Sequence, residues 1–366
     1  MRSRILTVLF VLALLGLTSA VGCGGGTNES TTTSAAGSEA TSAQTTETGG
    51  PATGETITLK YAFFAPANSF PAVQMEKWAD EVEKRTNGRV KVETFPGGTL
   101  LTAKNMYDGV LQGVADIGLS CPTYEPGRFP LLSLNDLPGL YPNAKVAGLT
   151  FYDLIQEFKP AELDKFKVIT AFATEPGYIA TVKKVASLAD LKGMEIRSPG
   201  GPKALEALGA ASVGMPMSEV GQSLQTGVID GYLSSREVLK DFKFAEKTKY
   251  VVDYPLGVIS FAALMSKEKW DSLPADVQKV IDDLGAEMSL FAGSYLDDHV
   301  KESMTYAQGQ GVTFVTLSDA EKAKWDAALQ PLEQTAVSQV AGAGLPAQDF
   351  LSKLREKAAA YAQQYK

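Results

Sequence analysis

The chain has 366 residues, of which 45% are hydrophobic and 21% charged, a composition typical of soluble globular proteins and unlike that of a polytopic membrane protein. Its length favours two lobes over one small core. The 34 basic and 42 acidic side chains give a net charge of -8, which argues against a nucleic acid partner. One histidine, His299, and two cysteines, Cys23 and Cys121, exclude a histidine-rich zinc site and a disulfide framework and leave at most one histidine for a Ser-His-Asp hydrolase.

The first 22 residues are predicted to be a secretory signal. Arg2 and Arg4 precede an apolar run over residues 5–15, and small residues lead from this run to Cys23. The run is shorter than the ~20 residues that a membrane-spanning helix needs. Ala-Val-Gly-Cys at 20–23 resembles a bacterial lipobox, although Ala replaces the more usual Leu. Cys23 is therefore the predicted lipidation site, and the alternative is a cleaved signal followed by a chance cysteine.

A tether is predicted to follow the signal. Residues 24–56 contain no Ile, Leu, Phe, Tyr, Trp or Met and are rich in Ser, Thr and Gly. Such a segment cannot bury enough apolar surface to offset the entropy of ordering it. The sequence thus predicts a lipidated Cys23 and a disordered tether over 23–56.

Strand and helix patterns alternate from residue 57 onward. This rhythm predicts βαβ crossovers and a largely parallel sheet. Ser218 is expected to cap one of the helices, and Gly227 to end it. Strands are predicted over 57–64, 90–95, 116–120, 167–173, 178–182, 194–197 and 228–230, and helices over 70–85, 102–112, 202–208 and 218–225.

One predicted helix is much longer than the others. It runs from Pro274 to about Gln310, with Pro in its first turn and Gly311 after its end. A helix of ~35 residues spans ~50 Å, which is longer than one lobe is wide. We expect it to cross two lobes.

Several co-linear motifs carry a family resemblance. Together, over roughly residues 57–330, they resemble the solute-binding proteins of TRAP transporters (DctP type). The motifs are EVEKRTNGRV at 81–90, FPGGTL at 95–100, LQGVAD at 111–116, LADLKGMEIRSPG at 188–200, LGA at 208–210, MPMSEV at 215–220 and LQTGVIDG at 224–231.

The resemblance implies a fold and a division into lobes. The fold is α/β, two-lobed and periplasmic-binding-protein-like (type II-like), with crossing strands and a long lobe-spanning helix. Lobe I is expected to comprise residues 57–174 plus about 263–302, and lobe II residues 175–262 plus about 303–366.

The resemblance also implies a function. The protein would be an extracytoplasmic, lipid-anchored, monomeric receptor that binds a small organic acid between its lobes and delivers it to separate TRAP permease subunits in the membrane. It would be no enzyme and would need no cofactor or metal. The alternative is a sensory receptor that uses the same closure to contact a membrane kinase or chemoreceptor.

Arg197 is the first candidate for ligand binding. It lies at the carboxyl end of a predicted strand, where open α/β sheets place their ligand crevices. A planar guanidinium grips a carboxylate through two parallel hydrogen bonds. In the family that the sequence resembles, the matching arginine pairs with the ligand's carboxylate. The alternative is a surface arginine paired with Glu195 or Asp190.

Two positions depart from the pattern of acid-binding family members. Tyr178 stands where some members carry a second arginine, and Ser234 where the usual asparagine falls. The loss of a cation indicates a ligand with one carboxylate, or a smaller or more aromatic acid.

Other candidates lie in loops that follow predicted strands. Phe64, Tyr178 and Met217 would cover an apolar part of the ligand, while Asn68, Ser120 and Ser234 would bond its polar end, and each has the alternative of a core role. Two charged residues also have alternative roles: Glu237 would accept from an ammonium group or pair with Arg236, and Arg128 would be a second cation or a hinge or surface residue. The candidate ligand-binding residues are Arg197, Tyr178, Ser234, Met217, Phe64, Asn68, Ser120, Tyr124 and Glu237.

We predict that Cys23→Ser releases the protein from membranes into the soluble fraction or the medium. A single acyl group binds a membrane only marginally, so a firm hold needs the multiply acylated cysteine of a lipoprotein. Membrane fractionation and immunoblotting compare the variant with the wild type. Equal membrane association of the two proteins would show that Cys23 is not the anchor.

Overall fold

The computed structural model describes residues 56–200 and 203–365. The predicted signal, Cys23 and the tether up to residue 55 lie outside the described residues. Among the helices of the described part, none is both long and apolar enough to cross a membrane.

The first sheet contains five strands in the order β2-β1-β3-β10-β4. β1 pairs in parallel with β2 and β3, whereas β10 runs antiparallel to both β3 and β4. Helices α1, α2 and α3 connect these strands along the sequence. The bounds are β1 Ile57–Phe63, α1 Phe70–Arg85, β2 Val90–Phe95, α2 Met106–Leu111, β3 Ile117–Ser120, α3 Ala144–Phe158, β4 Phe166–Ala173 and β10 Ser260–Ser266, with 3₁₀ turns at Pro122–Tyr124 (η1), Leu132–Asp136 (η2) and Ala161–Leu163 (η3).

The second sheet contains six strands in the order β11-β9-β5-β8-β6-β7. β6 pairs in parallel with β7 and β8, and β5 runs antiparallel to β8 and β9. The bounds are β5 Tyr178–Thr181, α4 Leu188–Leu191, β6 Glu195–Ser198, α5 Ala204–Ala207, β7 Ala211–Gly214, α6 Met217–Thr226, β8 Gly231–Ser234, α7 Val238–Asp241, η4 Phe244–Glu246, β9 Tyr250–Val252 and β11 Thr313–Val315.

Most predicted elements are present, with three local corrections. The strand predicted over 228–230 is wrong, because Gly227 ends α6 in a left-handed conformation and the paired strand, β8, begins only at Gly231. Ser218 is not a cap, since α6 begins at Met217. α2 begins at Met106, four residues later than predicted, because the Asn105 side chain holds the preceding turn by accepting from the backbone N–H of Thr102.

The expectation of largely parallel sheets is only partly met. Strands β4 and β5 are consecutive in the sequence but belong to different sheets. The same is true of β9 and β10. A strand that enters a sheet from the other lobe, without a helical crossover, can pair antiparallel with its neighbours. This explains why β5 and β10 are the antiparallel members.

Two backbone segments connect the sheets, and they bond to each other. The Thr174 N–H donates to Ile259 O at 3.0 Å, and the N–H groups of Gly177 and Leu256 donate to the carbonyl oxygens of Gly257 and Gly177, each at 2.8 Å. The residues on either side belong to β4 and β5 in one segment and to β9 and β10 in the other. Within the described residues, these crossing segments are the only backbone route between the two sheets before α9.

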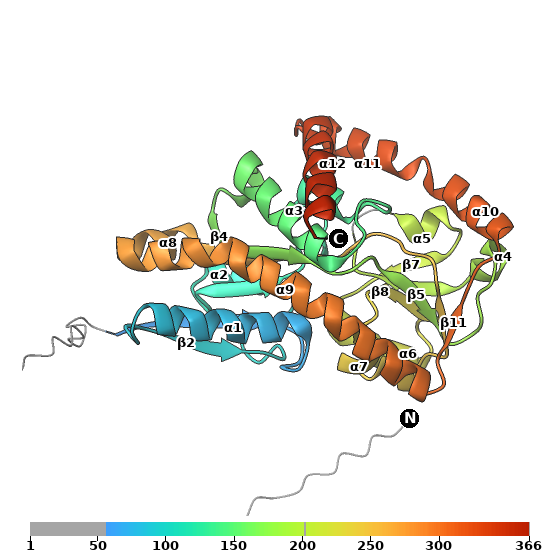
Figure 1. The fold of residues 1–366 in the computed structure, drawn as a ribbon, viewed down its shortest axis with the longest axis horizontal. Coiled ribbons are helices and arrows are strands. Elements are labelled where there is room, and N and C mark those ends of the chain that lie inside the picture. Colours follow the sequence, from blue (N-terminus) through green and yellow to red (C-terminus); the bar gives the residue numbers. More distant parts are fainter. Residues whose placement is uncertain (1–55, 201–202, 366) are drawn as a thin grey trace, which may run out of the picture. The chain divides into compact units, whose positions relative to one another are not determined.

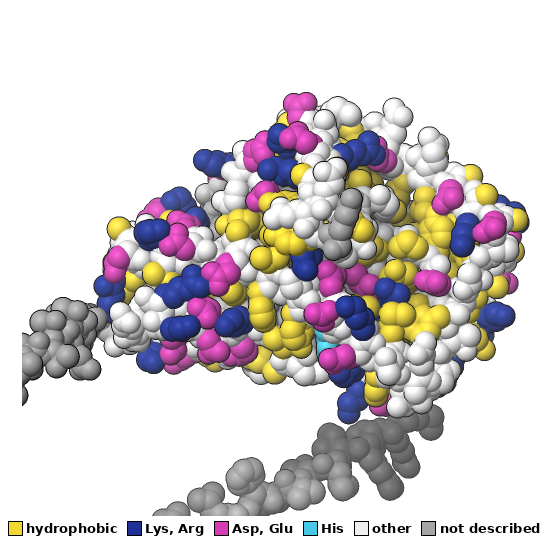
Figure 2. Space-filling view, in the orientation of Figure 1, with side chains coloured by type: hydrophobic (Ala, Val, Ile, Leu, Met, Phe, Trp, Pro, Cys, Tyr) yellow, Lys and Arg dark blue, Asp and Glu magenta, His cyan; other side chains and the backbone are white. Residues whose placement is uncertain are grey.

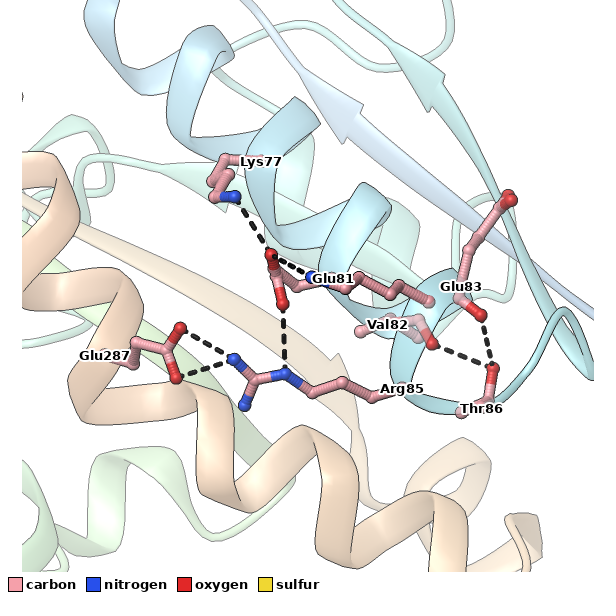
Figure 3. Close-up of polar contacts among 8 residues, drawn as sticks. Lys77, Glu81, Val82, Glu83, Arg85, Thr86 and Glu287 are labelled. Atoms are coloured by element: carbon pink, nitrogen blue, oxygen red, sulfur yellow. Dashed lines mark hydrogen bonds and ion pairs between the residues drawn. The ribbon is translucent and has the colours of Figure 1, made fainter.

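Helix α9, Ala275–Gly309, has the predicted length of 35 residues, and Pro274 is its N-cap residue. It packs against α1, α3 and β4 at one end and against α7 at the other (Figure 1). The contact with α1 includes a bidentate ion pair, in which Arg85 Nη2 lies 2.7 and 2.8 Å from the Glu287 oxygens (Figure 3). α9 therefore touches elements of both lobes, as predicted.

The C-terminal helices are divided between the sheets. α10 contacts α4 and α5, whereas α12 packs against α3 and buries Phe350 and Leu354 there. α12 thus packs on a helix that connects strands of the first sheet, which differs from the predicted assignment of 303–366 to lobe II. The bounds of the remaining helices are α8 Lys267–Ser272, α10 Asp319–Leu329, α11 Leu332–Gly342 and α12 Ala347–Gln364.

We predict that Gly257→Ala destabilises the protein. A Cβ at this position would lie 1.8 Å from the backbone oxygen of Asp136, so one of the two segments must shift. Overpacking of this kind costs about 1–3 kcal/mol, which lowers the melting temperature by several degrees. Gly214→Ala is the matched control, because a Cβ there meets nothing within 4 Å. Thermal melts in which both variants match the wild type would contradict the prediction.

Candidate functional site

Arg197 lies in β6, and its side chain is fully buried, with 0% exposure. Its Nε and Nη1 donate to the backbone oxygens of Met215 and Leu233 at 2.8 and 3.1 Å, and its Nη2 donates to the Tyr124 hydroxyl at 2.9 Å. All three acceptors are neutral. Within residues 56–200 and 203–365, no carboxylate forms an ion pair with this buried cation.

The alternative partners of Arg197 are engaged elsewhere. The carboxylate of Asp190 accepts from Ser187 and from the backbone N–H of Ala186 at 2.9 Å. Glu195 is exposed, and its backbone N–H donates to Asp230. The interpretation of Arg197 as a paired surface arginine is therefore wrong.

The Tyr124 hydroxyl oxygen occupies a position suited to an anion. It accepts from Arg197 Nη2 and, at 3.1 Å, from the backbone N–H of Met217, the first residue of α6. Free N–H groups at a helix N-terminus favour negative charge. Burial raises the pKa of Tyr124, so the oxygen in this position belongs to a neutral phenol. Tyr124 belongs to η1, which follows β3 of the first sheet, and Met217 to α6, which follows β7 of the second. Their hydrogen bond therefore links elements of the two sheets.

A small cavity adjoins the Tyr124 ring. Its volume is about 30 Å³, which is room for about two water molecules. Most of its wall is apolar and rich in phenylalanine. The lining comprises Phe63, Phe64, Ala65, Ser69, Phe70, Pro71, Tyr124, Thr174, Met217, Ser234, Ser235, Glu237, Val238, Asp241, Phe242, Ile259 and Phe261.

One part of this cavity wall is polar and acidic. Ser235 Oγ donates to Glu237 Oε1 at 2.8 Å, and burial raises the pKa of Glu237 to about 8. Asp241 Oδ1 lies 2.7 Å from His299 Nε2, and this contact raises the pKa of His299. His299, a residue of the long helix α9, thus forms a buried pair with Asp241.

The structure brings together five of the predicted site residues on the cavity wall: Phe64, Tyr124, Met217, Ser234 and Glu237. Arg197 is not part of that wall, because it lies behind Tyr124, to which it is bonded. The ligand-binding roles of all these residues remain predictions.

Besides Arg197, three predicted site residues do not line the cavity. The half-buried Tyr178 ring lies under the guanidinium of Arg236, whose Cζ is 4.1 Å from the ring centroid. Asn68 is exposed and donates to the backbone oxygen of Asp241 at 3.1 Å. Ser120 is buried within β3, where its backbone pairs with β10.

Ion pairs bear on the alternative roles of Glu237 and Arg128. Arg236 forms a bidentate ion pair with Glu175, with distances of 3.0 and 2.7 Å, so it is not the partner of Glu237. Arg128 pairs with Glu125 and, at 2.8 Å, with Asp108, away from the cavity. Glu237 therefore faces the cavity without a cation from the described residues, and Arg128 does not line that cavity.

Sequence reasoning missed much of the apolar wall and one acid. Phe261 and Ile259 belong to the second crossing segment and the start of β10, whose position beside β3 and β4 depends on sheet order. Asp241 follows Glu237 by four residues, one helical turn, and this spacing was the one signal that linked them.

Similarity to known proteins agrees with this geometry. Residues 61–339 match the family described as bacterial extracellular solute-binding protein, family 7 (DctP). A solute-binding protein of Albidiferax ferrireducens is 30% identical over 268 residues, which cover 69% of this protein and 76% of that one.

Two solved structures share the fold. A TRAP periplasmic solute binding protein from Desulfovibrio salexigens, an open complex with the C-terminus of a symmetry mate in its ligand binding site, is 42% identical with a TM-score of 0.73, covering 85% of the present sequence and 98% of its own. A marine metagenome TRAP solute binding protein specific for aromatic acid ligands, in complex with metahydroxyphenylacetate, is 32% identical with a TM-score of 0.79, covering 83% and 99%. Because the family match covers most of the sequence, this protein belongs to the DctP family of bacterial extracellular solute-binding proteins.

Proposed function

We propose that this protein is the receptor of a TRAP-type transporter for an aromatic monocarboxylate, which it binds between its lobes and delivers to the membrane permease. The observation that carries the proposal is the buried Arg197 guanidinium, which has only neutral acceptors among the described residues and lies next to a cavity walled by phenylalanine. The ligand's carboxylate meets Arg197, and its ring meets the phenylalanines.

The charge of Arg197 requires an anion. A guanidinium stays protonated at all physiological pH values, and a buried charge without a counter-charge is costly. Backbone carbonyls and a phenol orient Arg197 but supply only dipoles. Hydrogen bonds between two charged groups are shorter and roughly twice as strong as neutral ones. A carboxylate therefore replaces the Tyr124 hydroxyl with a gain in free energy.

The size of the cavity requires movement. About 30 Å³ is too little for an aromatic ring, so binding must be accompanied by a shift of Tyr124 or a change in the distance between the lobes. The crossing segments at 174–177 and 256–259 are short and carry glycines, which suits a hinge. Tyr124 leaves the position between Arg197 and Met217 as the ligand's carboxylate enters.

The related structures support the ligand class. The Desulfovibrio salexigens protein holds the C-terminus of a symmetry mate, a group that bears a carboxylate, in its ligand binding site. The metagenome protein is specific for aromatic acids. Both are binding proteins of TRAP transporters, which favours transport over the sensory alternative.

The anchor and the partners belong to the same proposal. The receptor is monomeric and extracytoplasmic, held to the membrane through lipidated Cys23 and the tether, and it meets permease subunits that are separate proteins. It acts by binding and release, without catalysis. Charged side chains of both signs are interspersed among hydrophobic and uncharged ones on the face seen in Figure 2.

We predict that Arg197→Ala and Arg197→Lys both lose affinity for benzoate and phenylacetate. Removing one member of a buried charge pair costs ~2–5 kcal/mol, or roughly 30- to 4,000-fold in Kd. Lysine also fails, because an ammonium group cannot supply a planar two-pronged contact. Isothermal titration calorimetry measures Kd, and Arg355→Ala is the control, since Arg355 pairs with Glu333 on the surface. Wild-type affinity in a folded Arg197→Ala protein would overturn the proposed carboxylate site.

We also predict that Tyr124→Phe binds these acids at least as tightly as the wild type. The phenol oxygen competes with the carboxylate for Arg197 and for the Met217 N–H, and phenylalanine removes the competitor while keeping the ring. The expected change is an equal or up to about 10-fold lower Kd, by analogy with the ~1 kcal/mol net value of a hydrogen bond. Tyr306→Phe on α9 is the control. A Kd raised more than 10-fold would mean that the hydroxyl bonds to the ligand instead of yielding to it.

A further inference from the structure

Two carboxyl oxygens on the cavity wall are buried without a hydrogen-bond partner. Among the described residues, Glu237 Oε2 and Asp241 Oδ2 have no partner, although their side chains are only 4% and 7% exposed. The other oxygen of each group is bonded, to Ser235 and His299 respectively. Buried polar atoms are nearly always hydrogen-bonded. Two unpartnered oxygens on one wall of a ligand cavity therefore point to a ligand group that bonds to them.

The two oxygens differ in chemistry. Burial raises the pKa of Glu237 to about 8, so its carboxyl group keeps a proton at pH 7. Ser235 donates to Oε1, which leaves Oε2 to carry that proton as a donor. Asp241 turns Oδ1 to His299, and its Oδ2 remains an acceptor. A donor and an acceptor thus lie on the same wall.

We propose that Glu237 and Asp241 form a subsite for a hydroxyl group on the ring of the ligand. The inference rests on the proposed function, because it presumes an aromatic acid whose carboxylate is held by Arg197. A hydroxyl group both accepts and donates, so it satisfies Glu237 Oε2 and Asp241 Oδ2 together. An ammonium group only donates, and a methyl group does neither.

The surroundings favour an uncharged substituent. Arg236 is committed to Glu175, so no cation in the described part of the protein offsets an ionised Glu237. The rest of the wall near this subsite is apolar and includes Phe70, Val238 and Phe261. The related protein in complex with metahydroxyphenylacetate holds a ligand that bears both a carboxylate and a ring hydroxyl.

The test compares ligands that differ only at the substituent. Isothermal titration calorimetry at pH 7 measures Kd for 3- and 4-hydroxybenzoate, each beside the methylbenzoate substituted at the same position. Methyl and hydroxyl groups are similar in size, so the ratio of the two Kd values isolates hydrogen bonding. We expect at least one hydroxybenzoate to bind about 10-fold or more tightly than its methyl counterpart, because a site built to bond a hydroxyl discriminates against its absence.

Variants of Glu237 test whether this residue causes the difference in Kd between the hydroxyl and methyl acids. Glu237→Met is expected to reduce the ratio to about 1–3, and Glu237→Gln, which retains a donor and an acceptor, to keep most of it. Because each ratio is measured within one variant, a general loss of affinity or stability cancels. Glu206→Gln, at an exposed position of α5, is the matched control and should keep the wild-type ratio.

Each outcome distinguishes the inference from the function on which it rests. Equal Kd values for hydroxy and methyl acids in the wild type, or a ratio preserved in a folded Glu237→Met protein, would overturn the subsite while leaving an Arg197-dependent aromatic acid site intact. Failure of every benzoate to bind, with no effect of Arg197 variants, would instead overturn the proposed function.

Discussion

A buried positive charge without a counter-charge is the constraint on which the site depends. The guanidinium of Arg197 is oriented by the carbonyl oxygens of Met215 and Leu233, which come from the segments next to it in the second sheet. These dipoles fix its direction but do not neutralise it. The low-dielectric surroundings that make an unpaired charge unfavourable also strengthen its attraction for a carboxylate. In the proposed function, the selectivity for anions therefore depends on the single side chain of Arg197.

The same constraint couples binding to the lobes. Tyr124 reaches Arg197 from an element that follows β3 of the first sheet, and Asn68 bonds to the backbone of Asp241 in a similar way. These two hydrogen bonds link the lobes only while their donors and acceptors stay within bonding distance. In the proposed function, a ligand that displaces the Tyr124 oxygen would exchange one bridge between the lobes for another, and the paired crossing segments at 174–177 and 256–259 would be the hinge.

Sequence patterns predicted those helices and strands that hydrophobic periodicity and proline or glycine residues at their ends determine, and little beyond them. α1, β2 and α9 were predicted to within a residue or two, because amphipathic spacing, Pro274 and the glycine turns mark them. Arg197 was singled out because it lies near the end of a strand before a glycine-rich turn and because it matches the arginine of the family that the sequence resembles. Phe261 could not be placed, since its neighbours come from strand order, and the absence of a cation beside Glu237 among the described residues became visible only once Arg236 was seen to pair with Glu175.

Burial acts in opposite ways on Arg197, behind the cavity wall, and on Glu237, on that wall, and both effects favour an anionic ligand in the proposed function. An arginine cannot shed its proton when it is buried, so it remains a cation in need of a partner. A buried glutamate can take up a proton, and the pKa of Glu237 rises to about 8 for that reason. At pH 7 the protonated Glu237 therefore does not repel the carboxylate that Arg197 attracts. As the pH rises through about 8, Glu237 ionises, and the same residue then opposes the anion. In the proposed function, a net charge of -8 does not prevent the binding of an anion, because the charges near the cavity, and not the total charge, determine the local potential.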